Sequence, residues 1–148
     1  MAKVLIDTNI LVYAHQPAEN AKYSRALDAI AMLVDSRQGR VSAQILGEFM
    51  SATTRGRNPI LGMDDARAQV TRLADAMPVL DVTRLIVLDA ARGVSEHQLS
   101  YYDAQIWATA RLNQVSTIFT EDFPEGQRLE GISFVNPLLP RFDLEPWI

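Results

Sequence analysis

Short apolar runs alternate with longer amphipathic stretches along the whole chain, and this alternation limits the folds open to it. The run Lys3–Ile6 is apolar without polar alternation, which predicts a strand buried on both faces. The β-branched run Ser116–Thr120 predicts a second strand. Between them, apolar residues recur at helical spacing over 20–38, and Gly39 stands where a C-terminal cap belongs. Strands and helices in alternation form a parallel sheet covered by helices. We therefore expect an α/β protein: a three-layer α/β/α sandwich with a central, mostly parallel sheet of four to five strands.

The remaining elements follow the same alternation. Further strands are expected at 40–43, 79–82 and 132–135, and helices at 44–55, 64–76, 84–96 and 101–113. Asp64 and Thr83 are predicted N-caps. Ser100 and Asp103 have the spacing of a capping box.

Length and composition indicate an ordinary globular domain. A chain of 148 residues is expected to form a single domain over 1–148, and 48% apolar residues argue against disorder. The tail 137–148, with Phe142 and Trp147, is too apolar to stay free, so we expect it to pack on the body or on a second subunit. The absence of cysteine excludes disulfides, thiolate zinc sites and cysteine nucleophiles.

Targeting signals and charge add few constraints. The apolar run before Asp7 is too short for a signal peptide, and no stretch reaches the roughly 18 apolar residues of a membrane span. We therefore expect a cytoplasmic protein that does not bind membranes. The net charge of −4 gives no support for non-specific nucleic-acid binding.

Acidic residues recur just beyond predicted strands or near helix starts, at Asp7, Glu48, Asp103 and Asp122. Strand ends converge at the carboxyl edge of an open parallel sheet, so acids that are far apart in sequence can meet there. Each acid also has a simpler structural explanation. Asp7 suits an N-cap, Asp103 a capping box, Glu48 a solvated helix border, and Asp122 a polar turn in which Glu121 is an equal candidate.

Asp103 is the acid that a structural role explains least well. On a helical wheel it lies in line with Trp107 and Ala110, on the apolar face of its helix. A capping box accounts for its position but not for this inward direction. Burying a carboxylate is costly unless it is paired or bound to a metal.

Carboxylates that gather within a few ångströms repel one another, and hard divalent cations with oxygen ligands remove that penalty. Mg²⁺ or Mn²⁺ is the expected occupant. Zinc favours imidazole or thiolate ligands, and His15 and His97, the only histidines, are not spaced as a ligand pair. The chain has no glycine-rich phosphate loop and no nucleophile elbow.

The acidic segments together resemble the PIN domain, the fold of the VapC-type toxins of bacterial toxin–antitoxin pairs. The matching segments, in chain order, are Asp7-Thr8-Asn9, Glu48, Tyr102-Asp103-Ala104 and Thr120-Glu121-Asp122. Their order and intervals agree from Lys3 to Asn136. Each motif is short, but their ordered combination is fairly specific.

The resemblance implies a site and a cofactor. Asp7, Asp103 and Asp122 would be ligands of one or two Mg²⁺ or Mn²⁺ ions, and Glu48 a ligand or a water-orienting group. The resemblance also gives supporting roles, the placing of ligands or of the scissile phosphate, to Asn9, Thr120 and Glu121.

The expected function is metal-dependent endonucleolytic cleavage of RNA, as the toxin of a type II pair. The expected partners are the RNA substrate, a small antitoxin and a second copy in a homodimer. Arg55, Arg57 and Arg37 are candidates for steering RNA phosphates from outside the pocket. The alternative is a catalytically inert PIN-like docking module. A small-molecule phosphohydrolase is disfavoured, because aspartyl-nucleophile enzymes carry a second Asp where this chain has Asn9.

Overall fold

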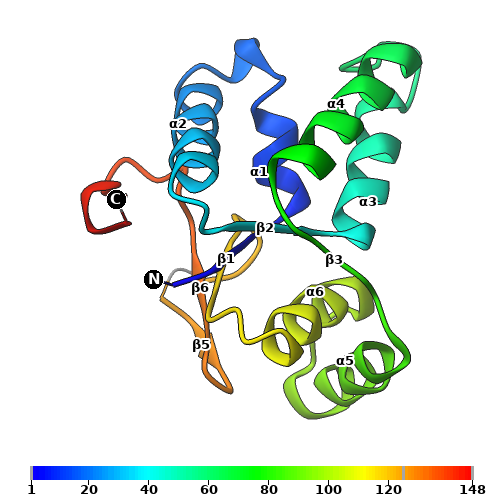
Figure 1. Cartoon of the computed structure of the whole chain (residues 1–148), viewed down its shortest axis with the longest axis vertical. Coiled ribbons are helices and arrows are strands. Elements are labelled where there is room, and N and C mark those ends of the chain that lie inside the picture. Colours follow the sequence, from blue (N-terminus) through cyan, green and yellow to red (C-terminus); the bar gives the residue numbers. More distant parts are fainter. Residues whose placement is uncertain (1, 125, 148) are drawn as a thin grey trace.

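One sheet with its strands in the order β3-β2-β1-β4-β6-β5 runs through the middle of the protein (Figure 1). The computed structural model describes residues 2–124 and 126–147. Its strands are β1 (Val4–Ile6), β2 (Gly39–Ser42), β3 (Val79–Leu80), β4 (Thr117–Phe119), β5 (Arg128–Leu129) and β6 (Ile132–Val135). All neighbouring pairs are parallel except β5 with β6.

The mostly parallel sheet is confirmed, with β5 as a strand that the sequence did not predict. β5 forms a hairpin with β6 in which Leu129 pairs with Ile132. The two turn residues, Glu130 (φ 47°) and Gly131 (φ 84°), both have positive φ, as a type I′ turn requires. Glutamate is unusual at the first of these positions, which is why the sequence did not indicate this turn. The sheet therefore has six strands, where four to five were predicted.

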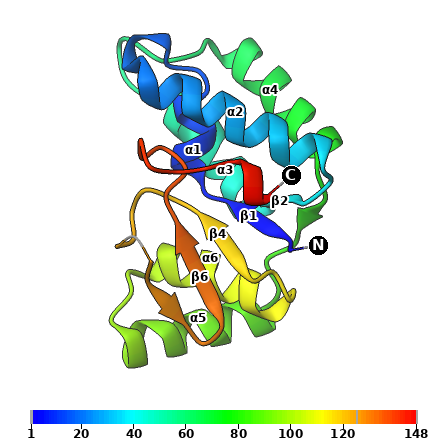
Figure 2. The ribbon, with the colours of Figure 1, turned by 90° about the vertical axis from the view of Figure 1, so that its left-hand side faces the viewer.

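Helices cover both faces of the sheet, and the three-layer prediction is confirmed (Figures 1 and 2). On one face lie α1 (Thr8–Tyr13), α2 (Ala21–Asp35), α3 (Ala43–Thr54) and α4 (Met63–Ala76). On the other lie α5 (Arg84–His97) and α6 (Tyr101–Leu112). Two short 3₁₀ helices span Pro17–Glu19 and Glu145–Trp147. No helix within the described residues is long and apolar enough to cross a membrane.

The predicted caps had mixed outcomes. The C-terminal cap expected at Gly39 is wrong, because α2 ends at Asp35 with Ser36 as its C-cap, and Gly39 is the first residue of β2. The Thr83 hydroxyl accepts a hydrogen bond from the Ile86 amide, so the cap of α5 is confirmed. Asp64 is not an N-cap, because α4 begins one residue earlier, after Gly62, and Asp64 lies in its first turn beside the positive end of the helix dipole. The capping box is also wrong, since the Ser100 side chain makes no cap bond.

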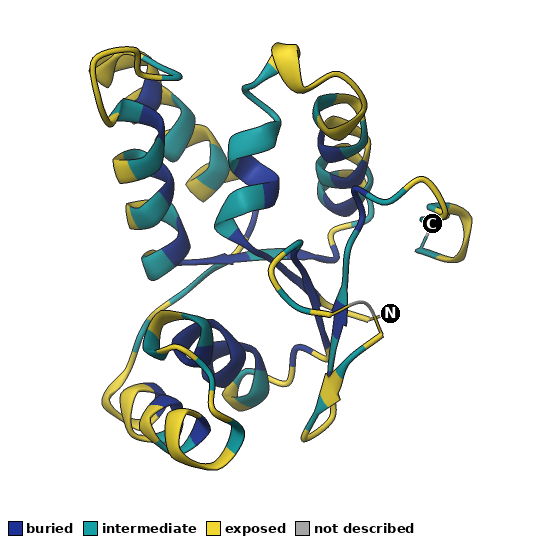
Figure 3. Cartoon of the chain, turned by 180° about the vertical axis from the view of Figure 1, so that it is seen from behind, coloured by how far each residue is buried: buried dark blue, intermediate teal, exposed yellow. Residues whose placement is uncertain are grey.

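The core is continuous across the sheet and is deepest along β1 and α6 (Figure 3). All three residues of β1 are fully buried, and α6 buries seven consecutive residues from Ala104 to Ala110. Helix α6 is enclosed because α5 covers it from outside, and Gly93 allows this approach: a Cβ there would lie 2.8 Å from Cζ3 of Trp107. The burial of α6 fixes the direction in which its first turn points.

The described part of the tail contacts the body through its aromatic rings. Phe142 and Trp147 lie edge-on to Phe119, with ring centroids 5.5 and 5.0 Å away. Phe119 is the last residue of β4, so these contacts brace the point where the chain leaves the sheet. Packing of the tail on a second subunit stays a prediction.

Candidate active site

The strand order reverses between β1 and β4, and this point determines where a site can form. The chain leaves β1 towards β2 on one side, while β4 and β6 lie on the other. In open parallel sheets such a switch point opens a crevice outside the carboxyl ends of the strands, where ligands bind. Asp7 directly follows β1 and Thr120 directly follows β4, so both stand at this crevice.

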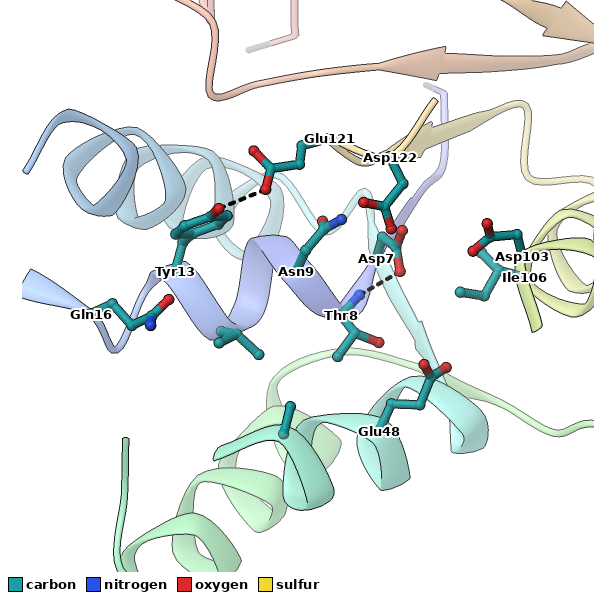
Figure 4. A pocket seen from close by; sticks show the side chains of 12 residues that line it. Asp7, Thr8, Asn9, Tyr13, Gln16, Glu48, Asp103, Ile106, Glu121 and Asp122 are labelled. Atoms are coloured by element: carbon teal, nitrogen blue, oxygen red, sulfur yellow. Dashed lines mark hydrogen bonds between the residues drawn. The ribbon is translucent and has the colours of Figure 1, made fainter. Parts of the chain in front are cut away.

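A pocket of about 330 Å³ occupies the crevice, and all four predicted acids line it (Figure 4). The acids come from four segments: Asp7 caps α1, Glu48 lies in α3, Asp103 lies in the first turn of α6, and Asp122 follows β4. The complete lining is Asp7, Thr8, Asn9, Val12, Tyr13, Gln16, Glu48, Ala52, Asp103, Ile106, Glu121 and Asp122.

Asp7 is the buried acid of the group, at 4% exposed. Its Oδ1 accepts a 2.7 Å hydrogen bond from the Thr8 amide, and its Oδ2 accepts one of 2.7 Å from the Thr120 hydroxyl. The backbone amide of Asp7 donates to the Phe119 carbonyl at 2.9 Å, which ties it to the end of β4. The carboxylate is thus held in one orientation.

Thr120 connects two of the acids. Its hydroxyl donates to Asp7 and accepts a 3.1 Å bond from the Asp122 amide, and the residue is only 1% exposed. Because one oxygen contacts both segments, the loop after β4 is fixed relative to the end of β1. The family resemblance gave Thr120 a supporting role, and these contacts place it where it could hold both acidic segments.

The environment of the pocket favours the neutral form of several acids. Burial raises the pKa of Asp7 to about 7, against the opposing bonds from Thr120 and Thr8, and the charges of Asp122 and Asp103 raise it further. Burial also raises the pKa of Glu48 and that of Asp122, with the charge of Asp103 adding to both. Mutual repulsion of this kind is what a bound cation would relieve.

Glu48 is oriented by residues that the sequence analysis did not identify. Gln44 Nε2 donates to Glu48 Oε1 at 2.6 Å and to the Tyr102 carbonyl at 3.1 Å. Gln105 Nε2 donates to Gln44 Oε1 at 2.9 Å, and the Tyr101 hydroxyl donates to Gln105 at 2.8 Å. This chain of amides joins α3 to α6 behind the pocket. The only signal in the sequence was the spacing of Gln44 one helical turn before Glu48.

Asp103 points into the pocket from the first turn of α6 (Figure 4). Its direction follows from the burial of α6, because the same face continues into Trp107 in the core. The Asp103 side chain thus points inward, as expected from the sequence. The predicted capping box with Ser100 is not formed.

The structure separates Asp122 from its neighbour Glu121. In Figure 4 the Asp122 side chain points toward Asp7, while Glu121 points away from it toward Tyr13. Glu121 accepts a 2.6 Å hydrogen bond from the Tyr13 hydroxyl and forms an ion pair with Lys22 at 3.1 Å. Asp122 is thus placed as the fourth acid, and Glu121 belongs to the rim.

Two further side chains next to Asp7 carry buried polar atoms without hydrogen-bond partners. These atoms are Oγ1 of Thr8 and both Oδ1 and Nδ2 of Asn9. Asn9 lies close enough to Asp122 to lower the pKa of that carboxyl, but with geometry too poor for a good bond. Unpaired buried groups cost free energy unless a ligand, ion or water satisfies them. Their position fits a site that receives a ligand.

The residues present fit a hard divalent cation. The donor set is oxygen-only, made of carboxylates with an amide and a hydroxyl nearby, which suits Mg²⁺ or Mn²⁺. Within the described residues, no three of the pocket acids have ligand atoms within 4.8 Å of one another. Mg²⁺ usually keeps several waters and binds through one or two carboxylates, so this wider spacing is compatible with it.

The tightest group of potential ligands in the described chain lies elsewhere, at Glu96, His97 and Glu130. Arg92 already bridges its two acids, donating to Glu96 at 2.7 Å and to Glu130 at 2.8 Å. His97 Nε2 lies 2.6 Å from Glu130. A guanidinium in this position supplies the positive charge, so we interpret the group as an ion-pair network that attaches α5 to the β5–β6 hairpin.

The three arginine candidates lie outside the pocket lining. Arg55 and Arg57 are exposed in the loop between α3 and α4. Arg37 precedes β2, at the amino-terminal edge of the sheet and therefore opposite the pocket. Arg37 is therefore not placed to contact a ligand in this pocket.

The comparison with models of protein families shows to which family the chain belongs. The family model described as "PIN domain" matches residues 4–123, most of the chain, including all four acids. The protein belongs to the PIN domain family. This confirms the family resemblance inferred from the acidic motifs. No curated protein matches the chain.

Solved structures of toxin–antitoxin systems share the fold. VapBC2 from Rickettsia felis, bound to promoter DNA, has 15% identity and a TM-score of 0.67, with 90% of this chain and 97% of that chain covered. VapBC from Salmonella typhimurium, also DNA-bound, has 16% identity and a TM-score of 0.68, covering 93% and 99%. VapC20 from Mycobacterium tuberculosis, a Sarcin-Ricin loop cleaving toxin, has 21% identity and a TM-score of 0.64, covering 81% and 90%.

Proposed function

We propose that this PIN-domain protein is a divalent-metal-dependent endoribonuclease that hydrolyses RNA phosphodiester bonds. The observation that carries the proposal is the convergence of Asp7, Glu48, Asp103 and Asp122 from four separate segments into one pocket at the switch point of the sheet. Nothing in the fold requires four carboxylates to converge there, and their repulsion costs stability. A site for a cation accounts for the arrangement.

The proposed ligands are Asp7, Asp103 and Asp122, with Glu48 as a further ligand or as the group that orients a water. Bound there, one or two Mg²⁺ or Mn²⁺ ions would lower the pKa of a coordinated water and stabilise charge on the leaving oxygen. Thr120 and the Thr8 amide hold the Asp7 carboxylate in place.

Other residues of the pocket prepare it for the substrate. Gln44 holds Glu48 Oε1, so the other carboxylate oxygen of Glu48 stays available to accept a hydrogen bond from a water. The unpaired amide of Asn9 can donate to a phosphate oxygen, and its carbonyl can accept from a water. Arg55 and Arg57, exposed beyond the end of α3, would steer RNA phosphates by charge.

We further propose that the protein is the toxin of a type II toxin–antitoxin pair that acts in the cytoplasm. Two observations support this. The fold matches toxin structures over nearly their whole length, and several of these structures are complexes with an antitoxin. The proposed partners are a small antitoxin protein and a second copy of the chain in a homodimer.

The test is cleavage of a labelled RNA in the presence of Mg²⁺ or Mn²⁺. We expect activity that EDTA abolishes, and that Asp7→Asn and Asp103→Asn each reduce at least about a hundredfold. Asp28→Asn, an exposed acid of α2 outside the pocket, is the matched control and should keep wild-type activity. Activity that persists in EDTA, or in both pocket variants, would rule the proposal out.

The alternative of an inert docking module predicts a different response to metal. A working site gains stability on binding a cation, by mass action and by relief of repulsion. Mg²⁺ or Mn²⁺ should therefore raise the melting temperature of the wild type but not that of Asp7→Asn. An inert module would show no such difference and no cleavage.

A further inference from the structure

Lys22, in the first turn of α2, is joined to the rim of the acidic pocket through two residues that line it. Its ammonium donates to Glu121 Oε2 at 3.1 Å and to the Tyr13 hydroxyl oxygen at 3.4 Å. The Tyr13 hydroxyl in turn donates to Glu121 Oε1 at 2.6 Å, and the ammonium lies 5.0 Å from the centre of the Tyr13 ring. Figure 4 shows Tyr13 and Glu121 meeting at the end of the pocket away from Asp103.

This arrangement holds the Lys22 ammonium, paired with Glu121, at a fixed place beside the acidic pocket. The Lys22 side chain is 46% exposed, so its ammonium faces solvent although two of its contacts are taken. An ammonium has three N–H donors, and the contact to Tyr13 is long, which leaves capacity for another acceptor. The bond to Glu121 raises the pKa of Lys22, so the charge is present throughout the neutral range.

The surroundings indicate what that acceptor is. A polyanion that enters an acidic pocket needs positive charge at the entrance. The ion pairs of arginine in the described chain lie in the Arg92 and Arg111 network beside α5, not at the pocket lining. No lysine, arginine or histidine lines the pocket, and among the ion pairs of the described residues Lys22–Glu121 is the one that involves a lining residue.

We propose that Lys22 binds a phosphate of the RNA at the rim of the pocket, and that Tyr13 and Glu121 are positioning residues for its ammonium. The inference rests on the proposed function, because it takes RNA as the ligand. A lysine serves as a compact point charge for a phosphate, and the bonds from Tyr13 and Glu121 reduce the freedom that its long side chain would lose on binding.

The first experiment measures RNA binding separately from cleavage. Binding of a labelled single-stranded RNA is followed by fluorescence anisotropy in Mg²⁺, in the Asp103→Asn background, over a range of salt concentrations. Lys22→Met should bind about three- to tenfold more weakly, and its slope of log K against log salt should be smaller by about 0.7, the value for one phosphate contact on a single strand. Lys22→Arg should keep most of the affinity.

The matched control is Lys3→Met. Lys3 is the only other lysine of the chain, is exposed, and precedes β1 at the opposite edge of the sheet. The two variants lose the same charge, so a general effect of net charge changes both equally. An equal salt slope for Lys22→Met and Lys3→Met would overturn the inference. A lower melting temperature of Lys22→Met without a change of slope would show that Lys22 only fastens α2 to the loop, and would overturn it as well.

The second experiment tests the positioning role. Tyr13→Phe keeps the ring but loses both hydroxyl contacts, and should raise KM about two- to threefold with little change of kcat. The metal-induced rise in melting temperature should stay as in the wild type. Because Tyr13 acts through Lys22, the double variant should be no worse than Lys22→Met alone. Additive losses would overturn the positioning role.

The two proposals fail in different ways. Wild-type protein that binds RNA without cleaving it would refute the nuclease, while the salt slopes would still decide the role of Lys22. Wild-type protein that cleaves RNA with unchanged KM and salt slope in Lys22→Met would refute the role of Lys22 alone. Absence of RNA binding by the wild type would refute both.

Discussion

The Thr120 hydroxyl donates a 2.7 Å hydrogen bond to Oδ2 of Asp7, across 113 residues of sequence. The bond links the ends of the two neighbouring central strands, at the point where the strand order reverses. The same hydroxyl accepts from the Asp122 amide, so one buried oxygen fixes two proposed metal ligands. The precision of the site therefore depends on a residue that carries no charge.

Replacing Thr120 with valine should damage the site while sparing the fold. Valine has nearly the same shape but cannot donate to Asp7 or accept from Asp122. Loss of a partner that orients a ligand typically costs about 10- to 100-fold in metal affinity or activity, and we expect a loss of that size in RNA cleavage. Thr53→Val is the control, because Thr53 is equally buried but bonds only to backbone carbonyls within α3. Equal activity of the two variants would contradict the prediction.

The buried Asp7 should make the metal-free protein less stable as the pH rises. Its folded-state pKa of about 7 lies above the ordinary value of 3.8, so the folded state holds its proton more tightly than the unfolded state. The contribution is fully present below about pH 4 and is lost as the pH rises to about 7, at about 1.4 kcal/mol per pH unit at most.

Urea unfolding in EDTA between pH 4 and pH 8 measures this effect. Asp7→Asn should lose less stability than the wild type between pH 4 and pH 7, because only the raised pKa values of Glu48 and Asp122 then contribute, and it should be the more stable protein at neutral pH. Asp28→Asn should behave as the wild type. Saturating Mg²⁺ or Mn²⁺ should restore the wild type at neutral pH. Parallel pH profiles of wild type and Asp7→Asn would show that Asp7 is not the responsible group.

Gln44 should tune the site through Glu48. Methionine at this position keeps the length of the side chain but removes the 2.6 Å bond to Glu48 and the acceptor for Gln105. Glu48 would then be free to rotate, and we expect the metal concentration for half-maximal activity to rise about tenfold while KM for RNA changes little. Gln69→Met, in α4 and outside the pocket, is the control. A normal metal requirement in Gln44→Met would show that Glu48 needs no such support.

Two glycines in helices should respond to alanine in opposite directions. A Cβ at Gly93 of α5 would lie 2.8 Å from Cζ3 of Trp107, so Gly93→Ala should destabilise the protein by about 1–3 kcal/mol. A Cβ at Gly47 of α3 would meet no atom within 4 Å, so Gly47→Ala should stabilise it by about 0.5–1 kcal/mol through helix propensity. Denaturant unfolding of both variants measures these changes in the free energy of unfolding. If the two changes were equal, the close approach of α5 to α6 would be contradicted.

Local patterns in the sequence predicted most of the fold. The apolar runs identified β1, β4 and β6, and the helical spacing identified α2 to within a few residues. These signals are local, because burial of a strand or of one helix face selects residues at a fixed period. β5 was not predicted because it has only two residues, and because its turn has Glu130 where Asn, Asp or Gly is usual. The capping box at Ser100 failed because a matching spacing does not ensure that the hydrogen bonds form.

The sequence by itself determined which acids follow which elements, since strand ends and helix starts can be read along the chain. Only the tertiary structure decided their partners. It turned Asp122 rather than Glu121 toward Asp7, connected Gln44 to Gln105, and brought Lys22 to the pocket rim. Such contacts depend on side-chain positions within about an ångström, which are set by how whole helices pack on the sheet and not by any periodicity of the residues themselves.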